Sequence, residues 1–362
     1  MIVQNMDYRA IAIIDLDIIY NNVCYIKSKI DNNIKIMSIV KADAYGHGLV
    51  QVAKKLEPLV DSFGVVTIEE AKKLCQNNIT KEILILGEVN AQFLPYVSQN
   101  NISLSVYSKE ILDRYSDFCD KTKNKLNVHI AINSGMNRLG LEIDDYDNFE
   151  KIINQHYFIY KGIYSHFADS KDLEYCKYQN NNFMLAARYF ENKHIFFPTI
   201  HISSSYRAIK NEFCYNCVRL GILQYNNENY IDTPLQTAMT LKAKIIQIRA
   251  IKKDTIVGYN KSYVAKEKML IACVSIGYAD GLPLEIINGK VEFEGEFYDI
   301  LAVCMDYLII DLKNNIEIKV GNYINIFGKT LNPYDLAKMI NETNYILLSK
   351  ISNRVLKKYK NS

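Results

Sequence analysis

Short apolar runs rich in β-branched residues recur through the first two thirds of the chain, and most are separated by segments with helical spacing. The helical segments, such as residues 49–59 and 174–191, place apolar side chains three and four positions apart. This alternation of strand and helix predicts a parallel sheet. Eight successive strands favour an α/β fold with an N-terminal (β/α)8 TIM-type barrel over an open, doubly wound sheet. The predicted strands are residues 34–41, 62–67, 82–87, 102–107, 126–132, 160–167, 198–203 and 217–222.

The pattern changes beyond about residue 236, where strands follow one another without long helices between them. Residues 332–340 are an exception, because an Asn-Pro pair there is a helix start signal. We therefore expect a barrel domain over residues 1–236 and a mainly β domain over residues 237–362. The first ten residues or so are expected either in the barrel or paired with the C-terminal domain. The later strands are expected within residues 240–251, 269–279, 290–305, 307–312 and 323–328.

Composition and charge narrow the class of protein. The 362 residues are 49% hydrophobic and 23% charged, which is typical of a soluble globular protein. A net charge of +3 without a basic stripe argues against nucleic acid as a partner. Asp or Arg interrupts each N-terminal apolar run before it reaches membrane-spanning length, and no signal-peptide pattern is present, so we expect a cytoplasmic protein with no membrane contact.

The eight cysteines are too scattered for a disulfide framework, so we expect them to be reduced. Cys214 and Cys217 form a single C-x-x-C pair. With no second pair and no ligand histidine nearby, we favour core positions over a zinc or redox site.

Reactive side chains gather at the ends of the predicted barrel strands. Lys41 ends the first strand, Arg138 follows the fifth, His166 ends the sixth and residues 203–205 end the seventh, while residues 219–222 end the eighth. In barrels of this type the loops after the strands meet at one mouth, which holds the active site. A site at this mouth is therefore predicted.

Each candidate also has an ordinary structural interpretation. A lysine after an apolar run needs a partner, a lowered pKa or covalent use as an imine, but it can also extend its ammonium to solvent. Ser205, Gly221 and Ile222 stand where barrels bind phosphate, although a serine run is usually an ordinary loop. Arg219 and His166 fit either a cofactor site or, respectively, the surface and the core. His47 is interpreted as a turn or surface residue.

Nine motifs in a fixed order resemble the alanine racemases, which are fold-type III pyridoxal-phosphate enzymes. The strongest is VKADAYGHG (40–48), and the resemblance covers nearly the whole chain. The others are SGMNRLG (134–140), YSHFADS (164–170), HISSSY (201–206), VRLGI (218–222), VGYN (257–260), IGYADG (276–281), CMD (304–306) and TNYILLSKISNRV (343–355).

The resemblance implies pyridoxal 5'-phosphate as cofactor, bound covalently to Lys41, and a small amino acid, most simply alanine, as substrate. It implies that Lys41 and Tyr259 are two bases on opposite faces of the substrate, that a hydrogen-bonded chain to His166 and Arg219 tunes Tyr259, and that Arg219 faces the pyridine nitrogen of the cofactor. It also implies a homodimer with composite active sites, to which the partner subunit contributes Tyr259, Tyr278 and Met305. By the same resemblance, the phosphate is held by Tyr45, Ser205, Gly221, Ile222 and Tyr345, and the substrate carboxylate by Arg138 and the backbone of Met305.

The chain departs from the family pattern close to Arg138. Ala131 stands where the family usually has a carbamylated lysine that orients this arginine. Arg138 must then be held by other means, among which we considered a chloride ion, an ordered water and Asn133. Three further departures are Asn137 for Gly, Ser204 for Asn and Leu220 for Pro.

The sequence motifs are compatible with more than one function. The main hypothesis is an alanine racemase that supplies D-alanine for peptidoglycan. The alternatives are a racemase of serine or another amino acid, a related decarboxylase, and a weakly active cofactor-binding relative. Tyr345 favours alanine over serine, because serine-preferring relatives tend to have a smaller polar residue there. The acidic pattern of the decarboxylases is not seen, and Tyr259 with the whole C-terminal half argues against a simple cofactor carrier.

Overall fold

The computed structural model describes residues 8–228 and 232–360, which fall into two compact units. We call the first the barrel unit; it consists of Tyr20–Ala44 and Leu49–Gln224. The β unit contains the other described residues, among them the short segment Tyr45–Gly48. We keep residue 236 as a proposal for the domain boundary, because compact units and folding domains need not coincide.

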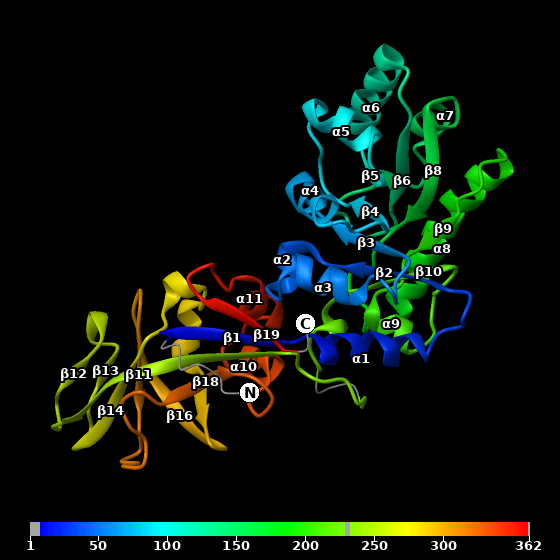
Figure 1. The fold of residues 1–362 in the computed structure, drawn as a ribbon. Helices are drawn as coiled ribbons and strands as arrows, with labels where there is room; N and C mark the ends of the chain where they lie inside the picture. The colour runs from blue at the N-terminus through cyan, green and yellow to red at the C-terminus, as the bar shows by residue number, and fades with distance from the viewer. Residues whose placement is uncertain (1–7, 229–231, 361–362) are drawn as a thin grey trace. The chain divides into compact units, whose positions relative to one another are not determined.

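The barrel unit contains the eight predicted strands, and the predicted fold is confirmed (Figure 1). Neighbouring strands pair in parallel in chain order, and β10 returns to pair with β2. The backbone N–H of Arg219 on β10 donates to Ser203 O just after β9, at 3.1 Å, which connects the two remaining edges. The strands are β2 (Lys35–Ile39), β3 (Ser62–Val65), β4 (Glu82–Ile85), β5 (Ile102–Val106), β6 (Leu126–Asn133), β8 (Phe158–Tyr164), β9 (Thr199–His201) and β10 (Cys217–Leu220).

Helices connect the barrel strands, and several begin at residues that cap them. Thr67 and Glu70 form a capping box, and Ser108 and Asp172 accept a backbone N–H at two other starts. Within the described residues, no helix is both long enough and apolar enough to cross a membrane. The helices of this unit include α3 (Leu49–Leu56), α4 (Ile68–Gln76), α5 (Leu94–Ser98), α6 (Lys109–Thr122), α7 (Tyr146–Ile153), α8 (Leu173–Asn192) and α9 (Ser205–Ile209).

The inside of the barrel carries an unusual number of polar side chains for a structure of this type, whose interior is mostly filled by branched apolar residues. Ser38 donates to Gln224 Oε1 at 2.8 Å, and Gln224 in turn donates to Ile39 O at 2.9 Å. Tyr164 donates to Ser105 Oγ at 2.9 Å. Because these groups are hydrogen-bonded to one another, the polar interior costs little of the stability that burial of unpaired groups would remove.

The β unit contains an antiparallel sheet in which six strands close into a ring, because β11 pairs with both β14 and β18. Strand β11 also pairs with β1 (Ala10–Asp15), which in turn pairs in parallel with β19 (Leu356–Lys360). The first seven residues lie outside the described part. The ring consists of β11 (Met239–Ile251), β14 (Met269–Val274), β15 (Lys290–Phe293), β16 (Glu296–Val303), β17 (Leu308–Asp311) and β18 (Tyr323–Phe327).

The remaining small elements of the β unit include two helices near the end of the chain and a hairpin. The predicted helix at the Asn-Pro signal is α10 (Pro333–Met339), and its cap Asn332 accepts the N–H of Tyr334. The second helix is α11 (Asn344–Ser349), which follows α10 after a short turn. The hairpin is formed by β12 (Ile256–Val257) and β13 (Tyr263–Val264).

Candidate active site

Lys41 lies two residues after the end of the first barrel strand, β2, and begins a turn with an unusual backbone. The next four residues, Ala42 to Tyr45, all have positive φ, between 52° and 55°. Each non-glycine residue in this left-handed conformation costs roughly 1–2 kcal/mol. A run of this kind persists only where the surroundings hold it, which is typical of functional sites.

Glu70 is the side chain that holds the start of this turn. One of its carboxylate oxygens accepts the N–H of Ala42 at 2.6 Å, and the other accepts the N–H of Val66 at 2.9 Å. Asp43 accepts the N–H of Leu49 at 2.8 Å and so fixes the other end of the turn to α3. The carboxylates of Glu70 and Asp43 therefore fix the backbone that presents Lys41.

The surroundings of Lys41 lower the pKa of its amine. Burial lowers its pKa most, the charges of Arg138 and Arg219 lower it further, and Glu70 acts against them. A lysine with a lowered pKa can act as a nucleophile or base near neutral pH. Of the charges that act on Lys41, two are arginines and one is a glutamate, a balance that suits an anionic ligand.

Arg219 is buried, and its two terminal nitrogens donate to neutral acceptors. It donates to the backbone oxygens of Ser165, His201 and Ile202 at 2.6–3.2 Å, to Nδ1 of His201 at 2.8 Å and to Nδ1 of His166 at 3.0 Å. Burial lowers the pKa of Arg219 to about 10. Burial and the charge of Arg219 lower the pKa of His166 to about 3, so His166 is neutral at physiological pH.

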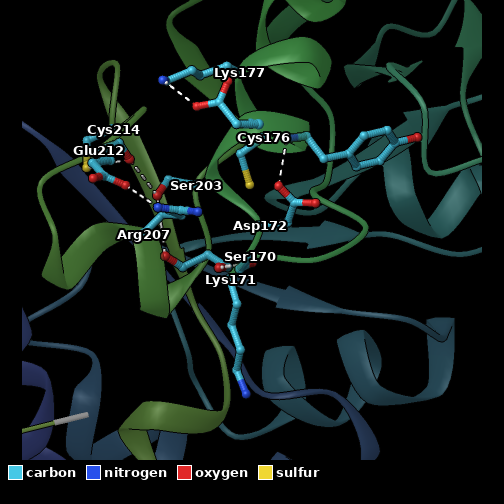
Figure 2. A network of polar contacts seen from close by, with 12 residues as sticks. Ser170, Lys171, Asp172, Cys176, Lys177, Ser203, Arg207, Glu212 and Cys214 are labelled. Atoms are coloured by element: carbon cyan, nitrogen blue, oxygen red, sulfur yellow. Dashed lines mark hydrogen bonds and ion pairs between the residues drawn. The ribbon is translucent and has the colours of Figure 1, made fainter. Parts of the chain in front are cut away.

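The serine run after β9 is an ordered loop in which each hydroxyl has its own partner. Ser203 donates to Glu212 O at 3.1 Å, and Ser204 and Ser170 share a hydrogen bond of 2.8 Å. Figure 2 shows Ser203 beside Arg207, whose guanidinium pairs with the Glu212 carboxylate. Ser205 accepts the backbone N–H of Gly221 at 2.7 Å. The structure thus brings Ser205 and Gly221 together, as the predicted phosphate site requires, with Ile222 next in the chain.

Arg138 differs from Arg219 in having no hydrogen bond or ion pair from its side chain to any residue that the structure describes. Its loop, however, is tightly held. Oδ1 of Asn133 accepts the N–H of Gly135 and of Asn137, and its Nδ2 donates to Asn137 and Glu142 at 2.9 Å. Asn133 therefore orders the loop but does not hold the Arg138 side chain. Asn137, at φ 58°, has a backbone that suits glycine or asparagine, which explains its substitution for Gly.

Helix α8 holds the Arg138 loop from its other side. The hydroxyl of Tyr175 donates to Gly135 O at 2.8 Å, and Asn182 Nδ2 donates to Ser134 O at 3.1 Å. With Ala131 buried on β6 and offering no charge, the position of Arg138 is set by the loop backbone. Neither Tyr175 nor Asn182 was found from the sequence, since nothing in a helical pattern marks residues that hydrogen-bond to a distant loop.

The β unit groups two of the predicted phosphate ligands with two further aromatic side chains. The ring of Tyr45 lies 5.8 Å from that of Tyr345 and 5.0 Å from that of Tyr225. Burial raises the pKa of Tyr45 and of Tyr345, so both keep their hydroxyl protons available for donation. His47 was expected in a turn or at the surface: it does lie in a turn, but it is not at the surface, since its ring is buried against Tyr225 and its Nδ1 donates to Tyr45 O at 2.8 Å.

Tyr259, Tyr278 and Met305 lie at turns of the β unit and expose 72%, 41% and 53% of their surface. The turns of Tyr278 and Met305 are joined, since Tyr278 N donates to Cys304 O and Ala279 N to Met305 O. Gly277 makes this possible, because a side chain there would meet both carbonyl oxygens at about 2.5 Å or less.

A buried carboxylate, Asp280, fixes the turn of Tyr278. It accepts hydrogen bonds from Arg9 at 2.6 Å and from the N–H of Gly277 at 2.9 Å. Arg9 also donates to Asp306 O at 2.8 Å, which connects the neighbouring turn of Met305. The single charged residue of IGYADG, Asp280, was the signal that could have identified this support from the sequence.

Both units match known sequence families. The profile of the alanine racemase N-terminal domain matches residues 14–228, and that of the alanine racemase C-terminal domain matches residues 238–359. This chain belongs to the alanine racemase family. Among curated alanine racemases, alanine racemase 1 of Caldanaerobacter subterraneus subsp. tengcongensis is 32% identical, over 95% of this chain and 93% of that protein. That of Methanococcus maripaludis is 32% identical, over 96% and 98%.

Solved alanine racemase structures share the fold. The enzyme of Clostridium difficile 630 superimposes with a TM-score of 0.91 at 32% identity, covering 98% of this chain and 97% of that one. The enzyme of Bacillus anthracis, solved with bound L-Ala-P, gives a TM-score of 0.91 at 28% identity, covering 99% and 96%. The resemblance inferred from the nine motifs is therefore confirmed at the level of family and fold.

The cysteine pair takes no part in this site. Cys217 is buried on β10, and the thiol of Cys214 donates to Glu212 O. Within the described residues, no three His, Cys, Asp or Glu side chains gather as they would around a metal ion. Burial raises the pKa of Cys217 to about 12, so its thiol stays protonated and unreactive.

Proposed function

We propose that this protein is a pyridoxal-phosphate-dependent racemase that interconverts L-alanine and D-alanine and supplies D-alanine for peptidoglycan. The observation that carries the proposal is the setting of Lys41, whose pKa is lowered by burial and by two arginines at the mouth of the barrel. Membership of the alanine racemase family supports the choice of reaction and substrate.

The donor set of the barrel unit fits an anionic cofactor. Lys41 would anchor it covalently, Arg219 would donate to its ring nitrogen, and Ser205, Gly221 and Ile222 would hold its phosphate with Tyr45 and Tyr345. The surplus of cations around Lys41 supports this assignment. When bound, the cofactor delocalises the negative charge that develops on the α-carbon of the substrate.

Side chains of the protein would carry out the proton transfers. Inversion needs one base on each face of the α-carbon, and we assign Lys41 Nζ to one face and Tyr259 Oη to the other. Neutral His166, held by Arg219, would hydrogen-bond to the phenol and help to tune it. Arg138 and the backbone of Met305 would receive the substrate carboxylate.

We further propose that a second copy of the chain supplies Tyr259, Tyr278 and Met305 to each site, in a homodimer. Their exposure on the β unit supports this proposal, because aromatic side chains that are exposed in one copy are common at interfaces between subunits. A dimer interface would also bring the Tyr259 phenol out of solvent, and exclusion of water limits side reactions at the α-carbon.

The test is to incubate the purified protein and cofactor with each L-amino acid in turn and to assay the D-enantiomer. D-alanine should dominate; D-serine as the main product would favour the serine alternative, and no D-product at all would refute a racemase. Lys41→Ala should remove the visible absorbance of the covalently bound cofactor. Tyr259→Phe should keep that absorbance but lose most racemisation, and full activity in this variant would exclude Tyr259 as a base.

A further inference from the structure

A chain of hydrogen bonds crosses the interior of the barrel from Arg219 to the opposite end. His201 Nδ1 lies 2.8 Å from Arg219, and its Nε2 lies 3.0 Å from Nδ1 of His129. His129 Nε2 lies 3.2 Å from the carboxylate of Glu82. Glu82 is the first residue of β4, at the amino end of the barrel strands, and its side chain is 22% exposed.

The donor in each hydrogen bond of this chain can be assigned. A guanidinium only donates, so His201 must accept at Nδ1 and carry its proton on Nε2. That proton points to His129, which must then accept at Nδ1 and carry its own proton on Nε2. The second proton points to Glu82, whose ionised carboxylate only accepts. Every donor thus points away from Arg219 and toward Glu82.

The two ends of this chain of hydrogen bonds, Arg219 and Glu82, carry opposite charges. Arg219 contacts three backbone oxygens and two imidazole nitrogens, and no carboxylate of the described residues. Glu82 is a carboxylate that the chain of hydrogen bonds connects to it. Burial acts to raise the pKa of Glu82, but hydrogen bonds from His129 and Ser103 outweigh it, so the net pKa is lowered and the group stays ionised.

The residues around His129 and His201 are tightly packed and leave little space for another arrangement of the two rings. Both imidazoles are fully buried. Gly162 faces His129, and a Cβ there would come within 2.4 Å of its Nδ1. The ring of Tyr164 stacks on His201 with centroids 5.1 Å apart and also lies 5.6 Å from the Arg219 guanidinium.

We propose that Glu82, His129 and His201 are positioning residues that fix the orientation of Arg219 by imposing one histidine tautomer on each ring. If the acceptor at Glu82 is replaced by a donor, the tautomers must change or a pair of donors must face each other, and Arg219 then loses its acceptor at His201. The importance of the Arg219 orientation for catalysis rests on the proposed function. The assignment of the histidine tautomers does not depend on that function.

The direct test is nitrogen NMR of protein labelled with 15N-histidine, measured without cofactor, because the two tautomers give distinct nitrogen shifts. The chain has six histidines. His156 and His194 are exposed, whereas His47, which donates from Nδ1, provides an internal example of the opposite tautomer. His129, His166 and His201 should all carry their proton on Nε2. An Nδ1–H or doubly protonated His201 would overturn the proposal.

Substitutions at Glu82 test the link to Arg219. Glu82→Lys replaces the acceptor with a donor and should shift the His129 and His201 signals and lower the rate of racemisation about tenfold, as expected for one lost hydrogen bond to a charged group. Glu82→Gln keeps an acceptor oxygen and should restore both the wild-type signals and most of the rate. Glu191→Lys makes the same charge change at an exposed position of α8 and is the matched control.

The outcomes separate this proposal from the proposed function. Unchanged histidine signals in Glu82→Lys would refute the positioning role even if the enzyme racemises alanine. Conversely, the predicted tautomers in a protein that produces no D-amino acid would refute the proposed function alone. If Glu82→Lys does not fold, the wild-type spectrum and Glu82→Gln still decide the question.

Discussion

Arg219 and Arg138 are both cations of the same barrel mouth, yet the protein places them in opposite ways. Arg219 is buried and has five acceptors around its guanidinium. Arg138 is exposed, and only the backbone of its loop is held, by Asn133 on one side and by α8 on the other. A group with a fixed electrostatic role needs side-chain contacts, whereas a group that must receive a ligand keeps its donors available.

The largest effect is expected from substitution of the buried arginine, Arg219. Arg219→Ala leaves buried acceptors without donors, so the free energy of unfolding should fall by about 3 kcal/mol or more, and racemisation should be lost. Arg219→Lys should also lose most activity, because an ammonium cannot reproduce the forked contacts to His166 and His201. Denaturant unfolding and a D-alanine assay measure both effects. Wild-type stability in Arg219→Ala would contradict the role given to its contacts.

Low pH should destabilise the folded protein through the buried imidazole of His166. The pKa of His166 is about 3 in the folded protein, against about 6.5 when unfolded. Between these values the unfolded chain binds a proton that the folded chain does not, so the free energy of unfolding falls as the pH falls. Above about pH 6.5 the group contributes no pH dependence. Unfolding measured across this range should be less pH-dependent in His166→Gln, and an unchanged slope would exclude His166 as a source.

Removing the exposed arginine should affect substrate binding and leave stability almost unchanged. Arg138→Ala should raise KM for alanine about a hundredfold, as expected for a lost charge-assisted contact with a carboxylate. Its free energy of unfolding should stay within about 0.5 kcal/mol of wild type. Arg188→Ala removes the same charge from an exposed position of α8 and should behave as wild type. A large loss of stability in Arg138→Ala would reveal contacts that the structure does not show.

Loosening the loop should reproduce part of the effect of losing Arg138. Asn133→Ala removes four hydrogen bonds that order residues 133–142 and should raise KM about tenfold while the cofactor absorbance stays unchanged. Steady-state kinetics with alanine measure this. An unchanged KM would show that the loop does not depend on Asn133 to present Arg138.

The smallest effect is expected from the contact of the loop with α8. Tyr175→Phe removes one neutral hydrogen bond, to Gly135 O, and should raise KM by only about threefold. Tyr178→Phe is the matched control, because Tyr178 stacks on Tyr175 but its hydroxyl bonds to none of the described residues. Equal effects in the two variants would indicate a general change in packing rather than loss of the hydrogen bond.

Much of the barrel could be predicted because buried parallel strands leave a strong local signal. The runs around Ile36 and Leu104 are rich in apolar and β-branched residues, interrupted only by Lys35 and by serines, and their boundaries differ from the structure by only a few residues. Lys41 was found for a similar reason, since a lysine after such a run is costly to bury. The left-handed turn after it could not be predicted, because Ala42 and Ala44 have no intrinsic preference for positive φ.

The sequence by itself determined the family, the two kinds of fold and which side chains carry the candidate chemistry, because these depend on residue types and on their spacing along the chain. Only the tertiary structure decided how each of them is held. Glu70 reaches Ala42, Glu82 is connected to Arg219 through two histidines, and Tyr175 reaches the Arg138 loop. Such partners are far apart in the chain and carry no local pattern, since a hydrogen bond depends on the positions of two atoms in space.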